Sequence, residues 1–351
     1  MVDASYEKMA GALNARSMAI PAVKCDEFFN LISFLFTPDE ASIFVAMPIE
    51  HASLEEIAEN LSVTDLKKLS DQLETMADKG LIHTRERKGK KVYEALPLVP
   101  GILELQLMRG IVDERSKTMT LLLRDYTKGI KREMTSASPP PMEFYASGKK
   151  VVVEKEVDSK ATIVPYQELK DLLMQTDYIS CGTCICRHMG ALMGKSTTKP
   201  INNCMILGES AKFATERGFT TRLSKEEAVK RIEEAEEAGL IHQFSNNPER
   251  ATNLLCNCYK DMCMIIRGVS KSPFPSMAVT ARWLVKINQD DCTACEACIP
   301  RCQMDALKMV DGKLTRDEIR CIGCGVCMWV CPTEALYLDV REAGKIPLKQ
   351  C

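Results

Sequence analysis

The segments CTACEACIPRC, residues 292–302, and CIGCGVCMWVC, residues 321–331, decide how the C-terminal part of this 351-residue chain folds. In each segment four cysteines follow the spacing C-x2-C-x2-C-x3-C, and each cysteine of the first recurs 29 residues later in the second. The tripeptide Asp305-Ala306-Leu307 is echoed by Glu334-Ala335-Leu336 at the same offset. Residues 281–342 therefore form an internal repeat of two similar halves.

This spacing is typical of bacterial ferredoxins that carry two [4Fe–4S] clusters. Each cluster needs four soft thiolates, and the x2 spacing turns three successive sulfur atoms of one loop inward. The resemblance to these ferredoxins implies that the fourth ligand of each cluster comes from the other half of the repeat. One cluster is then held by Cys292, Cys295, Cys298 and Cys331. The other is held by Cys321, Cys324, Cys327 and Cys302.

The residues between these cysteines agree with such clusters, with one departure. Ala294, Gly323 and Gly325 are small, so the backbone N–H groups of both loops are able to approach the sulfur atoms. Cys331 is followed by the usual proline, whereas Cys302 is followed by Gln303. A zinc ribbon explains the pattern less well, because zinc usually takes two widely separated C-x2-C pairs.

Composition and charge exclude several classes of protein. The 46 Lys and Arg against 48 Asp and Glu give a net charge of −2, so no overall basic field attracts nucleic acid or anionic lipid. No uninterrupted apolar run approaches the ~18 residues of a membrane span. No export signal is visible, so we expect a cytoplasmic protein. Among its 17 cysteines only Cys25 and Cys351 lie outside residues 181–331, and no role is predicted for these two. In such a chain clustered cysteines indicate metal or redox chemistry before disulfides.

The length predicts two or three domains, at roughly 100–200 residues each. We expect an α+β multidomain protein in which a Ser- and Pro-rich linker follows the first domain. The predicted regions are a winged-helix-like domain with flanking helices (1–130), the linker (131–160), a mixed cysteine-rich central module (161–280), the bacterial-type 2[4Fe–4S] ferredoxin domain (281–342) and a tail (343–351).

Residues 37–95 predict three helices followed by a hairpin, an order typical of a winged helix. Capping boxes at Thr37–Glu40 and Ser53–Glu56 begin the first two helices, and Gly80 ends the third. Residues 53–80 carry seven acidic and three basic residues, a net charge of −4, which repels phosphate. The predicted wing, residues 84–91, carries a net charge of +4. We therefore expect this unit to dock on a protein partner or elsewhere in the chain rather than to bind DNA.

The central module holds seven cysteines, more than one cluster needs. Three interpretations stay open: a third Fe–S cluster, a zinc or other metal site, and a reactive or disulfide-forming pair. Cys184-x-Cys186 is too tightly spaced for both thiols to take the loop geometry of x2 ligands, so we expect one of the two to be spare. The provisional ligands are Cys186, Cys204, Cys256 and Cys258, and the provisional spares are Cys181, Cys184 and Cys263. Arg187 either lowers the pKa of a neighbouring thiol or donates a hydrogen bond to a cluster sulfur, or it is an exposed arginine that does neither.

From Leu35 to Leu336 the chain resembles a family of ferredoxin-like proteins of anaerobes. Its members join a winged-helix N-terminus, a central cysteine module and a two-cluster ferredoxin domain. The similarity rests on the following segments: Leu35–Ala41, Lys79–Ile82, Cys184–Arg187, Lys199-Pro200 with Cys204, Glu227-Ala228 with Ala238–Ile241, and Cys256–Cys258 with Cys263.

The sequence predicts an electron-transfer protein of anaerobic metabolism that exchanges single electrons with a partner oxidoreductase. The alternative is a redox-responsive transcription regulator, in which Fe–S clusters sense and the winged helix reads DNA. A third possibility is an enzyme that uses the central module as a catalytic cluster. No substrate pocket is recognisable from the sequence, so this possibility stays open. We expect no membrane span, and the sequence predicts neither the oligomeric state nor the identity of the partner.

Overall fold

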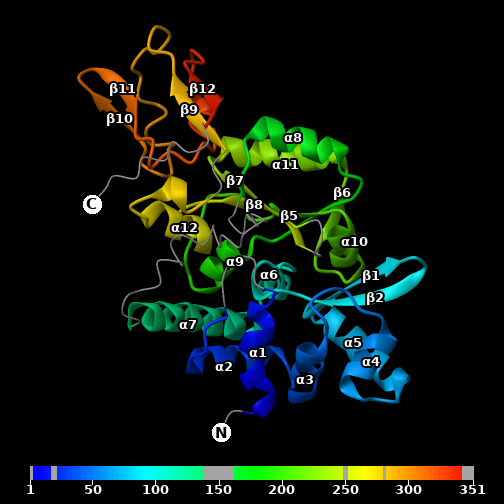
Figure 1. The fold of residues 1–351 in the computed structure, drawn as a ribbon. Coiled ribbons are helices and arrows are strands. Elements are labelled where there is room, and N and C mark those ends of the chain that lie inside the picture. Colours follow the sequence, from blue (N-terminus) through cyan, green and yellow to red (C-terminus); the bar gives the residue numbers. More distant parts are fainter. Residues whose placement is uncertain (1–2, 17–21, 137–161, 248–251, 280–281, 342–351) are drawn as a thin grey trace, which may run out of the picture.

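The computed structural model describes residues 3–16, 22–136, 162–247, 252–279 and 282–341, which form a mixed α+β structure. Helices of the N-terminal part lie at one end, a central sheet lies in the middle, and a small lobe of hairpins lies at the opposite end (Figure 1). No single helix in these ranges is long and apolar enough to cross a membrane. In the described residues, one pair of consecutive helices is long and apolar enough only when the two are taken together, Asp26–Leu35 with Pro38–Ala46, and this pair is bent by 96°.

The N-terminal part contains the helices and the hairpin expected over residues 37–95. Both predicted capping boxes form, at Thr37 with Glu40 and at Ser53 with Glu56. Hairpin strands β1 and β2 pair in antiparallel register, and Ala52 adds a bridge to Tyr93. The elements here are α1 (Ala4–Asn14), α2 (Asp26–Leu35), α3 (Pro38–Ala46), α4 (Leu54–Leu61), α5 (Leu66–Asp78), β1 (Ile82–Arg87), β2 (Lys90–Ala95), α6 (Leu103–Leu107) and α7 (Glu114–Ser136).

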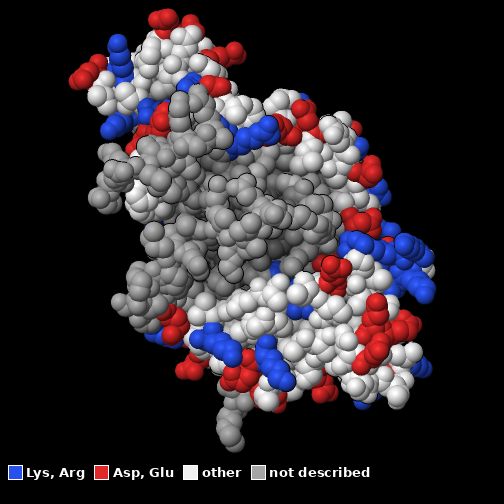
Figure 2. Space-filling model, viewed as in Figure 1, with Lys and Arg blue, Asp and Glu red and all other residues white. Residues whose placement is uncertain are grey.

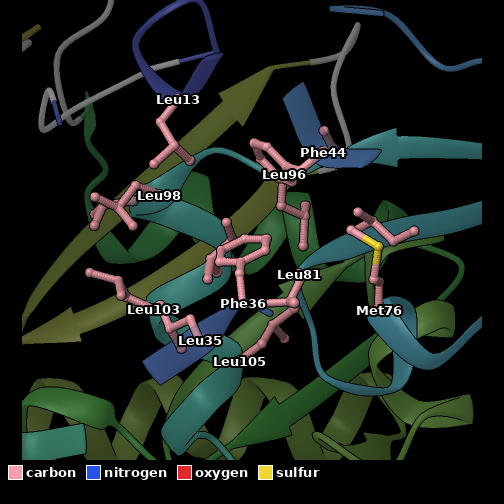
Figure 3. Close-up of a cluster of buried hydrophobic side chains, with 14 of the residues drawn as sticks. Leu13, Leu35, Phe36, Phe44, Met76, Leu81, Leu96, Leu98, Leu103 and Leu105 are labelled. Carbon is pink, nitrogen blue, oxygen red and sulfur yellow. The ribbon is translucent and has the colours of Figure 1, made fainter. Parts of the chain in front are cut away.

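One hydrophobic core joins the N-terminal part to the central module. Leu13, Phe36, Phe44 and Leu103 are among the buried side chains that converge on it from α1, α3, α6 and the segment after α2 (Figure 3). The same core continues into central-module residues such as Phe213. The two regions therefore share buried surface rather than packing as independent units.

The predicted linker is corrected at its start, because α7 continues to Ser136 and so covers residues 131–136 with helix. Residues 137–160, the rest of that linker, lie outside the described residues. The predicted tail 343–351, which contains Cys351, lies outside them as well.

The central module is built on an antiparallel sheet of strand order β3-β7-β8-β5-β4-β6. Its strands are β3 (Thr162–Ile163), β4 (Ile179–Gly182), β5 (Cys204–Leu207), β6 (Thr221–Leu223), β7 (Ile241–Asn247) and β8 (Thr252–Cys258). Helices α8 (Tyr166–Gln175) and α11 (Lys225–Glu237) lie side by side against one face (Figure 1). The opposite face packs on α9 (Ile185–Leu192), α10 (Glu209–Glu216) and the N-terminal core.

The alternation of side chains along each strand decides which cysteines face which side of the sheet. In β5, Met205 and Leu207 point toward α8 and α11, whereas Cys204 points toward the N-terminal core. Cys181 in β4 shares the α8 and α11 side with Ile179. The sheet therefore separates Cys181 from the thiol of Cys204.

The C-terminal lobe repeats one simple arrangement of short strands around its cysteine loops. Strands β9 (Trp283–Ile287) and β12 (Leu336–Val340) pair antiparallel, as do β10 (Leu307–Val310) and β11 (Lys313–Arg316). Helix α12 (Met264–Lys271) lies next to this lobe, between it and the central sheet (Figure 1).

Candidate metal centres

The cysteines of the C-terminal lobe gather in two sets, each of which draws on both halves of the repeat. A small cavity is lined by Cys292, Cys295 and Cys298 from one loop and by Cys331 from the other half. Burial raises the pKa of Cys298 to about 11, with nearby Cys295, Cys331 and Cys292 adding to the effect. We call these four residues the outer site.

The second set, which we call the inner site, consists of Cys302, Cys321, Cys324 and Cys327. Burial raises the pKa of Cys324 and of Cys327, and in both cases Cys302 and Cys321 add to the effect at close range. The Cys302 Sγ also accepts a hydrogen bond of 3.3 Å from the Ala306 N–H. Cys298 of the outer site contributes to the raised pKa of Cys327, so the two sites are neighbours.

Both loops curl by placing residues in the left-handed region between their cysteines. In the first loop these are Ala294 (φ 54°) and Glu296 (φ 61°), and in the second they are Gly323 (φ 64°) and Gly325 (φ 77°). Successive backbone N–H groups in such a loop form a concave surface that favours an anion. The donor chemistry and the backbone of both sites therefore fit an anionic cluster bound by four thiolates.

Six of the seven central cysteines line one cavity. Each thiol lies close enough to two others to shift their pKa, and these neighbouring pairs close a ring. The order around this ring is Cys184, Cys186, Cys263, Cys258, Cys256 and Cys204, which returns to Cys184. We call this arrangement the thiol ring.

The direction of the pKa shift alternates around the thiol ring. Hydrogen bonds from the two neighbouring thiols lower the pKa of Cys184, Cys256 and Cys263, that of Cys256 to about 6. The same contacts, together with burial, raise the pKa of Cys186, Cys204 and Cys258.

Three kinds of local structure position the thiol ring. Cys184 and Cys263 are the N-cap residues of α9 and α12, and Cys186 lies in the first turn of α9. Cys204 begins β5, and Cys256 and Cys258 lie two residues apart near the end of β8, on one side of the strand. Segments separated by about 50 residues in sequence therefore meet at one cavity.

The cavity brings together four predicted ligands and two predicted spares. Cys186, Cys204, Cys256 and Cys258, the predicted ligands, line it. Cys184 and Cys263, predicted as spares, line it too, because each is the N-cap residue of a helix that begins at the cavity. The third predicted spare, Cys181, lies outside the thiol ring, and its Sγ donates to the Asn202 carbonyl at 3.3 Å.

A buried arginine faces the same cavity. Arg187 is only 2% exposed, so it is not the exposed arginine of the alternative interpretation. Its Nη2 donates to the Asn203 Oδ1 and to the Asn257 carbonyl, both at 2.7 Å. Its Nε and Nη1 have no hydrogen-bond partner among the described residues. A guanidinium in this position needs a negative charge nearby.

A side-chain bridge joins the inner site to the thiol ring. Gln303, which follows inner-site Cys302, is buried and donates from Nε2 to the carbonyl of Cys258 at 3.3 Å. Its Oε1 accepts from the Lys260 N–H at 2.7 Å. The departure from the usual proline thus gives Cys302 a direct link to a cysteine of the thiol ring.

The acidic surface of α5 is partly occupied by the central module. Arg217, just after α10, approaches Glu74 at 2.6 Å and Asp78 at 2.5 Å. Lys91 of the hairpin also pairs with Glu74, at 2.8 Å. Figure 2 shows basic side chains gathered on the β1–β2 hairpin, with acidic ones on the helices beside it. These contacts favour an intrachain role for α5.

Comparisons with known proteins find one family match, which lies in the C-terminal lobe, and one similar ferredoxin. Residues 314–337 match the family described as 4Fe–4S binding domain. An uncharacterized ferredoxin of Methanocaldococcus jannaschii is 39% identical over 59 residues, which are 16% of this chain and 39% of that protein. This chain thus spans about two fifths of the length of that relative. No solved structure matches this chain. These similarities support [4Fe–4S] binding and an iron–sulfur electron-transfer role.

Proposed function

We propose that this chain relays single electrons to or from a partner oxidoreductase through two neighbouring [4Fe–4S] clusters in its C-terminal lobe. The observation that carries the proposal is the outer-site cavity, which is lined by three cysteines of one loop and by Cys331 of the other half. A [4Fe–4S] cluster bound there supplies a one-electron redox centre. The anaerobic, cytoplasmic setting rests on the resemblance to ferredoxin-like proteins of anaerobes.

The positions of the two sites give the relay a direction. Cys295 of the outer site is exposed, and the loop around it lies on the surface. Cys321 and Cys327 of the inner site are buried, and Glu236 of α11 is close enough to Cys324 to raise the pKa of that thiol further. A partner therefore reaches the outer site first, and the inner site connects it to the rest of the chain.

The surface around the outer site suggests the charge of that partner. Residues 288–298 contain three exposed acidic residues, Asp290, Asp291 and Glu296, and no basic residue. Complementary charge speeds the encounter of two proteins more than it tightens their complex. We therefore expect the partner to present a basic surface to this loop.

Neutralising this loop should slow electron transfer to a basic acceptor. In the variant Asp290→Asn/Asp291→Asn/Glu296→Gln, the rate of reduction of oxidised cytochrome c by the pre-reduced protein should fall on the order of tenfold at low ionic strength. Stopped-flow absorbance measures this rate. The matched control Glu55→Gln/Glu59→Gln/Asp71→Asn removes the same charge from exposed positions on α4 and α5. An equal fall in both variants, or no fall in the first, would count against docking at the outer site.

The regulator alternative has weaker support. The basic hairpin is its one favourable surface, whereas two acidic residues of α5 pair with Arg217 of the same chain. DNA-binding proteins need a cationic surface that extends over the element that reads the groove. Sequence-specific binding in a gel-shift experiment at physiological salt would restore this alternative.

A further inference from the structure

We infer that the thiol ring holds a third iron–sulfur cluster, a redox centre separate from the two of the C-terminal lobe. The inference rests on the proposed function only for the origin of its electrons. The metal centre itself is argued from the six converging thiols and the charges around them.

The surroundings of the ring are arranged to hold negative charge. Cys184 and Cys263 are the N-cap residues of α9 and α12, so both helices begin at the ring. The N-terminus is the positive end of a helix dipole and favours an anion. Arg187 adds a buried guanidinium that lines the cavity and has two unpartnered nitrogen atoms. An iron–sulfur cube with four thiolate ligands is anionic, so it supplies the charge that these groups lack.

The number of thiols argues for a cluster rather than a single zinc ion. A structural zinc site takes four ligands at most from its surroundings, usually as two C-x2-C pairs. Six cysteines line this cavity, and they come from four separate segments of the chain. The cysteines in the described ranges are all free, so no disulfide uses the ring.

The bridge through Gln303 gives this cluster an electron supply. Covalent bonds connect Cys302 of the inner site to the Gln303 amide, which is hydrogen-bonded to the Cys258 carbonyl. Its Nε2 also donates to the Gly239 carbonyl at 2.5 Å, which holds the side chain in place. With clusters bound at both sites, this path would connect them, and one electron passing along it would oxidise the inner cluster and reduce the central one.

Iron counting on anaerobically purified, reconstituted full-length protein tests the inference. Three cubes predict about 12 iron atoms per chain, and two predict about 8. The variant Cys186→Ser/Cys258→Ser removes two ring thiols and should lower the count from about 12 to about 8. The control Cys181→Ser changes a buried cysteine on the other face of the sheet and should keep about 12.

Each outcome bears on one claim. A wild-type protein with about 8 iron atoms, and with zinc or titratable thiols in the ring, overturns the third cluster. The wild type alone decides this, so a variant that fails to fold leaves the test intact. The variant Cys292→Ser/Cys295→Ser removes the outer cluster instead. A wild type that keeps iron only in the ring would overturn the proposed function and leave the third cluster standing.

Discussion

Replacing Cys302 with serine should empty the inner site and leave the outer site filled, although Cys302 belongs to the same half of the repeat as the outer-site loop. The reason is the crossed arrangement, in which Cys302 lies with Cys321, Cys324 and Cys327. A serine hydroxyl stays protonated at neutral pH and is a poor substitute for a soft thiolate. We expect the loss of about 4 iron atoms per chain.

Thiol labelling of the folded variant identifies the emptied site. Alkylation followed by mass spectrometry should modify Cys321, Cys324 and Cys327 in Cys302→Ser. The matched variant Cys331→Ser should instead expose the cysteines of the first loop, because Cys331 lines the outer-site cavity. Labelling of the first loop in Cys302→Ser would mean that each half of the repeat holds its own cluster.

Gly323→Ala should also remove the inner cluster, through the backbone rather than through a ligand. An added Cβ at this position would overlap the carbonyl group of Trp283, the first residue of β9. The loop and the strand would then be unable to keep their present positions together. We expect loss of about 4 iron atoms and labelling of the second loop, measured as above.

The repeat supplies the control for this variant. Ala294 occupies the equivalent position of the first loop and already has φ 54°, so a positive φ alone is tolerated there. Ala294→Gly should therefore keep both clusters. If Gly323→Ala also retains full iron content, the close approach to Trp283 is not a constraint on the inner site.

The sequence predicts most accurately where structure is local or periodic. The capping boxes at Thr37 and Ser53 form because their side-chain partners are three residues away. The grouping of the eight C-terminal cysteines is what the resemblance to two-cluster ferredoxins implies, and in the structure Cys331 lines the cavity of the first loop. These features need no knowledge of how distant segments pack.

The thiol ring was predicted only in part because it depends on distant packing. The sequence predicts Cys184 and Cys263 as spares, yet both line the cavity, and each is the N-cap residue of a helix. Strand alternation places Cys181 and Cys204 on opposite faces, but sequence alone does not say which face meets the other cysteines. The role of Gln303 likewise required the position of β8.

An anaerobic redox titration of the full chain, followed by EPR spectroscopy, tests the central claim most directly. The claim is that the C-terminal lobe exchanges single electrons through two neighbouring iron–sulfur clusters. Reduction should produce, reversibly, the signals of two reduced [4Fe–4S] clusters that broaden each other, because Cys298 and Cys327 bring the two sites together. A chain without redox-active iron in this lobe, with zinc bound to its cysteines, would contradict the account.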